Sequence, residues 1–345
     1  MTVFNADNVG TTKGYPLFLG DDLGLTDTIN VTYPILDELY EQQLAQLWNH
    51  REVDLTQDRM DMLNMTAGEV DLLTKTVSWQ WAADSIASRS IAQLLTPFTS
   101  NPELESLLNL WTFFETIHAK TYSHIVKQTF ADPTALLEET YKNEQLLTRA
   151  GPVVHALDNL SSSLGTKEDI LKGLTALLAL EAIAFNASFA VTFAMAERGK
   201  IQGTAQLVKL IARDELLHVS FHKALFDILK RDPAWADAFS DTSEERLDII
   251  TAVVHGECVW ADYLFTEGRQ VIGLSPTLLQ QYIEHLAEPV YKLSGFGTVD
   301  SLKNPLPFMD KWLDSSKMQV APQELQKTDY QVGTITDDSL DISFD

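Results

Sequence analysis

The chain has 345 residues, of which 45% are apolar, and a formal net charge of −24. That length can bury a large core, as one big domain or two modest ones. The acidic charge, without any cluster of Lys or Arg, argues against direct binding to nucleic acid or to an anionic membrane surface, since both attract basic patches.

The predicted elements are helices along almost the whole chain after a Gly- and Asp-dotted loop of 30 residues. Apolar residues recur at three- and four-residue steps, and sustained period-two alternation is absent from the sequence. The predicted helices are 33–49, 67–93, 102–129, 133–147, 168–198, 203–230, 242–272 and 276–294. A capping side chain ahead of a helix-starting Pro stands at Asn101-Pro102, Asp132-Pro133 and Ser275-Pro276. Long helices without strict heptads predict an all-α bundle.

The most apolar helix, 174–196, carries a single formal charge, Glu181. The run is long enough to span a bilayer. However, it also contains Asn186, Ser188 and Thr192, and it has no basic cluster on one flank. We therefore predict a buried helix of a soluble bundle rather than a membrane span.

Two further carboxylates stand alone in the same way. Asp84 is the only charged residue within 76–88, and Glu115 is the only one within 106–119. Glu115 is followed three residues later by His118, and in the same way Glu215 is followed by His218. This spacing places both side chains on one face of a helix. Two lone carboxylates and two Glu-x-x-His pairs on four helices are the ligand set of carboxylate-bridged dimetal bundles.

An alternative explains each carboxylate singly, as a hydrogen-bonded core residue or as a group on a narrow exposed face. It accounts poorly for four at once, because each one buried without a partner costs several kcal/mol or becomes protonated. Four carboxylates balance two divalent cations, and oxygen ligands with two imidazoles suit iron or manganese better than zinc or copper.

Tyr122 lies on the same face of its predicted helix as Glu115. It follows Glu115 by seven residues and His118 by four, so it projects beside the expected ligands. It is either an ordinary core tyrosine or a phenol placed for one-electron oxidation next to a metal pair that activates dioxygen.

The segments FFETIHAKTYSH, LEAIAFNASFA and LIARDELLH together closely resemble the radical-generating small subunit of class I ribonucleotide reductase. The resemblance extends from about Trp48 to the C-terminus. It implies a ferritin-like bundle, usually a homodimer, in which dioxygen oxidises Tyr122 to a stable radical. A separate large subunit would reduce ribonucleotides to deoxyribonucleotides for DNA replication. The implied ligands of two irons, oxo-bridged when oxidised, are Asp84, Glu115, His118, Glu181, Glu215 and His218. These ligand types barely distinguish iron from manganese.

The same resemblance assigns roles outside the ligand set. Trp48 and Asp214 would link to His118 and carry an electron and a proton out of the site. The apolar pocket around the radical would consist of Phe185, Phe189 and Ile211. From the residues alone, these five read as ordinary core or surface groups. Trp111 and Arg213 are candidate neighbours of the acids, and His222, His124 and His255 are interpreted as core or surface histidines.

The last 30 residues are polar and acidic, which predicts a mobile tail. By the resemblance, Tyr330 in this tail relays the radical between subunits. The terminal segment TDDSLDISFD, with Leu340, Ile342 and Phe344 as apolar anchors, would dock into the large subunit. The predicted organisation is a loop segment at 1–30, a helical domain at 31–315 and a docking tail at 316–345.

Cys258 is the single cysteine, so the chain cannot form the dithiol couple that ribonucleotide reduction requires. The cysteine usage and the absence of a signal-like start predict a cytoplasmic location, and Cys258 itself is expected to be buried. Two other functions remain open. One is a self-sufficient diiron oxidase or desaturase, and the other is a ferritin-like iron store or structural bundle.

Overall fold

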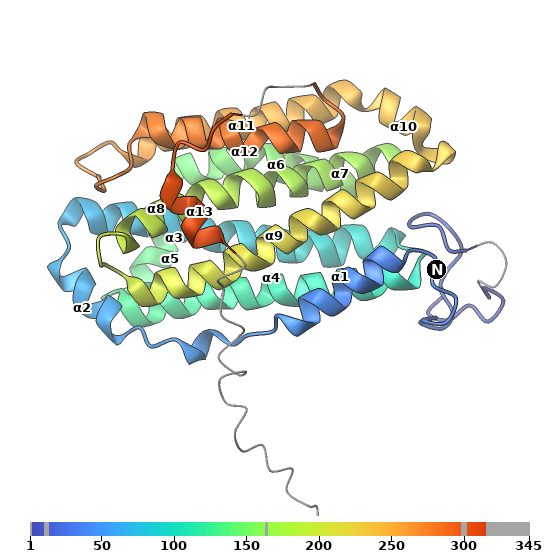
Figure 1. Cartoon of the computed structure of the whole chain (residues 1–345), viewed down its shortest axis with the longest axis horizontal. Coiled ribbons are helices and arrows are strands. Elements are labelled where there is room, and N and C mark those ends of the chain that lie inside the picture. Colours follow the sequence, from blue (N-terminus) through green and yellow to red (C-terminus); the bar gives the residue numbers. More distant parts are fainter. Residues whose placement is uncertain (1, 10–13, 163–164, 298–301, 315–345) are drawn as a thin grey trace, which may run out of the picture.

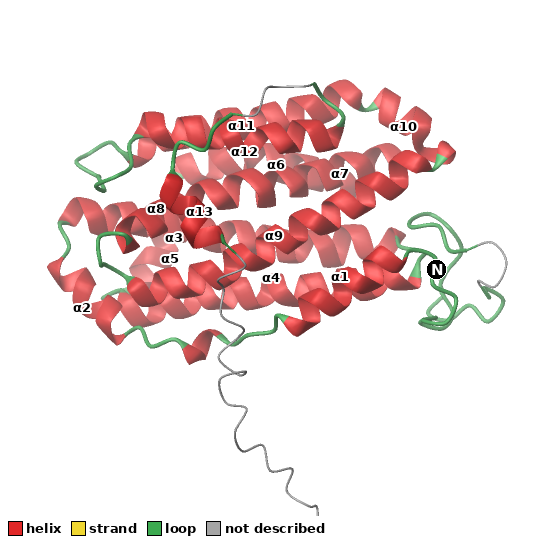
Figure 2. Ribbon diagram, in the orientation of Figure 1, coloured by secondary structure: helices red, strands yellow, loops and turns green. Residues whose placement is uncertain are grey.

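A computed structural model describes residues 2–9, 14–162, 165–297 and 302–314. In these ranges the chain is helical, and its only β pairing consists of two isolated bridges (Figures 1 and 2). The longer helices are α1 (Pro34–Ala45), α2 (Thr56–Asn64), α3 (Ala67–Ser90), α4 (Pro102–Thr129), α5 (Pro133–Lys142), α6 (Glu144–Ser162), α7 (Lys167–Ala179), α8 (Asn186–Ala196), α9 (Gln202–Arg231), α11 (Ser243–Leu264) and α12 (Pro276–Ser294). The short ones are η1 (His50–Glu52), η2 (Ile91–Leu95), η3 (Thr96–Phe98), η4 (Leu180–Phe185), η5 (Pro233–Trp235), α10 (Ala236–Asp241) and α13 (Pro307–Leu313). The all-α prediction is confirmed.

The three predicted helix starts are confirmed by their side-chain caps. Asn101 accepts a hydrogen bond from the backbone N–H of Leu104 at 2.7 Å, and Asp132 accepts one from Ala135 at 2.9 Å. Ser275 does the same at the start of α12. Each cap satisfies a backbone donor that the first helical turn leaves unpaired.

The apolar run forms one continuous helix over Lys167–Ala196, and its most hydropathic window is wholly buried inside the protein. This confirms a core helix rather than a membrane span. The helix is not regular, because η4 is a single π-helical turn between α7 and α8. The Asn186 side-chain amide donates to the backbone carbonyls of Glu181 and Ala182 at 3.2 and 3.3 Å. These bonds satisfy carbonyls where the helical ladder is disturbed.

Four elements enclose the centre of the bundle, namely α3, α4, α9 and the helix formed by α7, η4 and α8. α3 packs on α4 and α8, while α9 packs on α4, α8 and η4. α1 covers α4 and α9 along the lower edge in Figure 1, and α11 and α12 cover α7 and η4 along the upper edge. The centre is therefore shielded by helices on both sides.

The predicted helix boundaries differ most from the structure in two segments. The segment 133–147 is split, because Asn143 ends α5 and its side chain caps α6 at Gln145 and Leu146. α6 then continues through Pro152, whose missing N–H is offset by packing on α7 and α11. The segment 242–272 ends as a helix at Leu264, because Arg269 folds back and donates to the terminal carbonyl of Leu264 at 3.0 Å.

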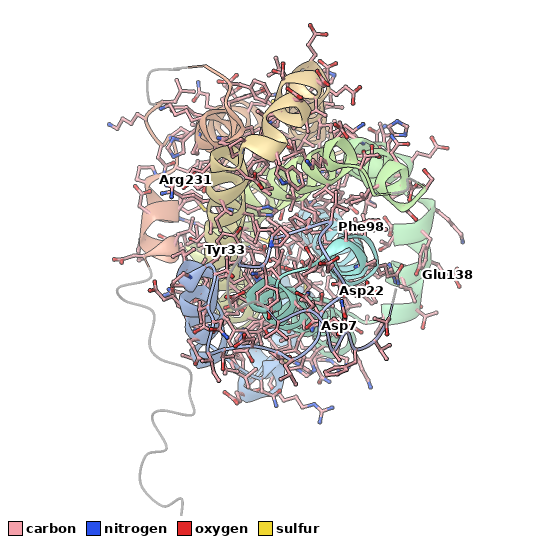
Figure 3. All side chains as sticks on the ribbon, turned by 90° about the vertical axis from the view of Figure 1, so that its right-hand side faces the viewer. Asp7, Asp22, Tyr33, Phe98, Glu138 and Arg231 are labelled. Carbon is pink, nitrogen blue, oxygen red and sulfur yellow. The ribbon has the colours of Figure 1, made fainter. Side chains whose placement is uncertain are left out.

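The N-terminal segment closes one end of the bundle, the end that faces the viewer in Figure 3. In its described part it forms loops and turns, with Leu17 and Phe18 buried. Phe18 pairs with Thr99 in a β bridge and contacts the Trp235 ring edge-on at 6.2 Å. The proposed domain boundaries at 30 and 315 stay predictions.

Cys258 on α11 is only partly buried, so the expectation of full burial is wrong. Burial and then the negative charges of Glu284 and Glu257 raise the pKa of its thiol to about 11. At pH 8 about one thiol in a thousand is then ionised, and the thiolate is the reactive form. We expect slow alkylation by iodoacetamide, with a rate that rises about tenfold per pH unit up to pH 11. Glutathione run in parallel is the control, and a rate that levels off near pH 9 would contradict this pKa.

Candidate metal centre

Six side chains converge where the four central elements meet. Asp84 comes from α3, Glu181 from η4, and each of α4 and α9 supplies one Glu-x-x-His pair. Asp84, Glu115, His118, Glu181, Glu215 and His218 are all 0% exposed. The i, i+3 spacing places each Glu and its His on the same face of the helix, toward the interior.

These six residues form two groups of four metal-ligand candidates. The first contains Asp84, Glu115, His118 and Glu215, and the second contains Glu115, Glu181, Glu215 and His218. Within each group, one candidate atom from every residue lies within 4.8 Å of the others. Glu115 and Glu215 belong to both groups, so each would help to hold both cations of a pair.

The donor atoms approach one another closely but without hydrogen-bond geometry. His118 Nδ1 lies 3.1 Å from Glu215 Oε1, and His218 Nδ1 lies 2.9 Å from Glu115 Oε1. Among the described residues, neither nitrogen has a hydrogen-bond partner, and neither do both oxygens of Asp84 and Glu215. Burying a polar atom without a hydrogen-bond partner costs free energy, and here several such atoms lie around the same interior region. The site therefore fits a pair of divalent cations.

The pKa values of these side chains show that burying them in their charged forms is unfavourable when no cation is present. Burial raises the pKa of Asp84 and of Glu181 well above the ordinary carboxyl value. Burial acts the same way on Glu115, but His118 and His218 outweigh it and lower its pKa to about 2. Burial opposes protonation of His218, yet Glu115 and Glu215 raise its pKa to about 10. Bound cations would replace the protons that the raised pKa values retain on Asp84, Glu181 and His218.

Tyr122 lies beside the cluster on α4. Its side chain is fully buried, and its hydroxyl has no hydrogen-bond partner in the described part of the chain. Burial, followed by the charges of Asp84, Glu215 and Glu115, raises the pKa of the phenol well above its usual value. The phenol is thus held protonated, shielded from water and within the field of the carboxylates.

A buried hydrogen-bond chain leads away from the cluster. Asp214 Oδ2 accepts a hydrogen bond from Trp48 Nε1 at 2.7 Å and lies 3.1 Å from His118 Nε2. Arg213 donates to the other oxygen of Asp214 at 3.1 Å and to the Gln46 carbonyl at 2.6 Å. Asp214 therefore joins Trp48 to His118, as the resemblance implied, although Trp48 and Asp214 are 166 residues apart.

The three predicted pocket residues, Phe185, Phe189 and Ile211, are fully buried. The rings of Phe185 and Phe189 stack with centroids 6.0 Å apart. Phe189 in turn contacts Phe193 on the same helix. These rings form an apolar row that begins within η4, where Glu181 also lies.

His222 belongs to the centre, so its interpretation as an ordinary core or surface histidine is incomplete. Its Nε2 lies 2.9 Å from Glu181 Oε2, and both side chains are fully buried. The signal was its position four residues after His218, on the same face of α9. Trp111 donates to Glu115 Oε1 at 3.2 Å, as considered from the sequence. His124 packs against the His50 ring, and His255 is exposed.

One predicted site residue, Tyr330, and the rest of the tail at 316–345 lie outside the described residues.

Comparison with known proteins agrees with this geometry. The family model described as "Ribonucleotide reductase, small chain" matches residues 26–299. The ribonucleoside-diphosphate reductase subunit beta of Haemophilus influenzae is 34% identical, over 93% of this chain and 92% of the relative. The ribonucleotide reductase R2 subunit from Clostridium botulinum has a TM-score of 0.82 at 23% identity and covers 91% of this chain and 98% of its own. The structure titled dimanganese(II)-NrdF of Streptococcus sanguinis has a TM-score of 0.72 at 20% identity and covers 86% and 100%.

The family match covers most of the chain, and the solved structures share its fold. Together with the buried carboxylate and histidine cluster, they confirm the predicted ferritin-like bundle. The chain therefore belongs to the small-chain family of ribonucleotide reductase.

Proposed function

We propose that this chain holds two iron ions, uses dioxygen to oxidise Tyr122 to a stable radical, and passes the oxidising equivalent to a large subunit that reduces ribonucleotides. Its membership of the family makes it the small subunit of ribonucleoside-diphosphate reductase, an oxidoreductase with a large-subunit partner. The proposal depends mainly on one observation, two ligand groups that share Glu115 and Glu215 near a buried phenol.

The donor set supports iron or manganese. Four carboxylates and two imidazoles balance two divalent cations, and these ligands are poorly matched to copper or zinc. When bound, a pair of ferrous ions would activate dioxygen, and dioxygen is the oxidant that accepts the electron removed from the phenol. Manganese is the alternative, and the name of the Streptococcus sanguinis structure specifies it for that protein.

Tyr122 has the properties that a stored radical requires. On oxidation its phenol loses one electron and one proton, so a buried, unpaired hydroxyl ends as a neutral radical without a buried charge. The full burial of Tyr122 excludes water and reductants. By the family resemblance, Phe185 and Phe189 would add to this protection, since their rings offer no groups that donate hydrogen atoms readily.

Trp48, Asp214 and His118 support a route between the centre and the rest of the holoenzyme. The Trp48 N–H points at Asp214 Oδ2, so the loss of an electron from Trp48 can be accompanied by transfer of its proton to that oxygen. Arg213 donates a hydrogen bond to the other oxygen of Asp214 and so helps to hold this carboxyl group in place. An electron that moves inward through Trp48, together with one proton, would restore Tyr122 to the phenol.

The tail would complete the route. In this proposal Tyr330 passes the electron between subunits, and Leu340, Ile342 and Phe344 dock by folding on the large subunit. The chain would act as a cytoplasmic homodimer, in keeping with a soluble helical subunit.

We expect Tyr330→Phe to retain the Tyr122 radical and to lose nearly all turnover with the large subunit, because phenylalanine cannot release a proton with its electron. The measurement pairs the EPR signal with deoxyribonucleotide formation. Tyr141→Phe, an exposed tyrosine on α5, is the control. Wild-type turnover by Tyr330→Phe would remove the relay from the proposal.

The proposed function is tested by adding ferrous iron and air to metal-free protein and recording the EPR spectrum. We expect a persistent tyrosyl signal and about two irons per chain. Deoxyribonucleotides should form only when the large subunit is added. Oxidation of an organic substrate by the chain alone, without such a signal, would favour the self-sufficient oxidase instead.

A further inference from the structure

Glu181 is the one ligand candidate whose backbone lies in a π-helical turn. Asn186 holds the carbonyls of Glu181 and Ala182, and Arg149 reaches the Ala184 carbonyl at 3.4 Å. Arg149 is itself fixed by a buried ion pair with Glu257. The backbone is therefore held from two sides, and what remains adjustable is the carboxylate of Glu181.

The two oxygens of that carboxylate have different surroundings. Oε2 lies 2.9 Å from His222 Nε2, whereas Oε1 has no hydrogen-bond partner among the residues that the structure describes. An ionised carboxylate can only accept hydrogen bonds, so Nε2 must carry the proton when Glu181 is ionised. His222 Nδ1 is then the unprotonated nitrogen of a neutral ring, and it is buried without a partner.

His222 is well placed to act as a rigid donor. It is fully buried on α9, one helical turn beyond His218. The Trp111 ring contacts it edge-on, with centroids 5.0 Å apart and planes at 85°. Trp111 also donates to Glu115, so the same indole contacts one carboxylate of the second ligand group directly and the histidine partner of another.

We propose that His222 is a positioning residue that occupies one oxygen of Glu181 and thereby presents the other, Oε1, as a single metal-binding atom. The inference rests on the proposed metal site. It gives Glu181, which belongs only to the second group, a support that Asp84, which belongs only to the first group, lacks, since both Asp84 oxygens are unpartnered among the described residues. Loss of His222 would release Oε2 and weaken the binding of one cation of the pair.

The test measures Mn(II) binding to metal-free protein by calorimetry and by EPR, without any assay of turnover. In His222→Leu we expect one of the two Mn(II) ions to bind about 10- to 100-fold more weakly, the usual cost of losing an outer hydrogen-bond partner of a ligand. The EPR spectrum at two equivalents should then show isolated Mn(II) instead of the coupled pair. His222→Gln keeps an N–H donor that can reach Glu181 and should restore most of the affinity.

His255→Gln, at an exposed histidine on α11, is the matched control and should bind both ions as the wild type does. If His222→Leu does not fold, His222→Asn replaces it, because the asparagine side chain is polar but too short to reach the Glu181 carboxylate. Two Mn(II) bound with wild-type affinity by Leu or Asn, or no recovery with Gln, would overturn the role of His222. Absence of paired Mn(II) from the wild type would instead overturn the proposed metal site.

Discussion

Glu115→Gln and Glu215→Gln are each expected to abolish paired metal binding, whereas Asp84→Asn and Glu181→Gln should each weaken one cation only. The reason is geometric, because Glu115 and Glu215 belong to both ligand groups and the other two acids belong to one each. An amide keeps the shape of the side chain but removes the charge. We expect affinity losses well above 100-fold, since even an outer partner is worth about 10- to 100-fold.

Metal content after dialysis, measured by mass spectrometry, gives the number of ions per chain for each variant. Glu105→Gln is the control, since it lies on α4 but outside both groups. The metal-free proteins provide a second measurement. In Asp84→Asn and Glu181→Gln the unfolding temperature should be unchanged or higher, because burial already disfavours the charged form of these two acids. Two tightly held ions in Glu115→Gln would contradict a shared ligand.

Tyr122→Phe should abolish the radical and the activity with the large subunit, while metal binding stays intact. The hydroxyl has no hydrogen-bond partner among the described residues, so its removal leaves no other group unpaired. The change in unfolding free energy should therefore be within about 1 kcal/mol, in contrast to the usual cost of breaking a buried hydrogen bond.

The measurement combines EPR after iron and air, metal content, and thermal unfolding. Tyr282→Phe is a matched control, because Tyr282 is also buried but lies on α12, outside the four central elements. It should keep the full signal. A persistent tyrosyl signal in Tyr122→Phe would move the radical to another residue.

Local signals in the sequence were enough to predict much of the helical framework. The caps at Asn101, Asp132 and Ser275 act within one turn, so their effect can be inferred without knowledge of the fold. No helix is predicted from the sequence over 148–162, yet α6 continues through Pro152, because packing of α6 on α7 and α11 outweighs the local cost of a proline. Tertiary packing routinely overrides propensity in this way.

The candidate ligands could be predicted because charge is expensive inside an apolar helix. Asp84, Glu115 and Glu181 stood out as single charges in uncharged segments, and two Glu-x-x-His pairs supplied the rest. The roles of Trp48 and Asp214 came from the family resemblance, since no pattern of spacing relates residues 166 positions apart.

The kinds of chemical group available, their order along the chain and the helical faces they occupy follow from the amino acids alone, because helix periodicity and the cost of buried charge act over a few residues. The packing of the four helices decided three other features. It determined which carboxylates are shared by both ligand groups, the contact between His222 and Glu181, and the departure of η4 from α-helical geometry. Those features depend on side chains that approach from different elements, and their distances are set only when the bundle closes.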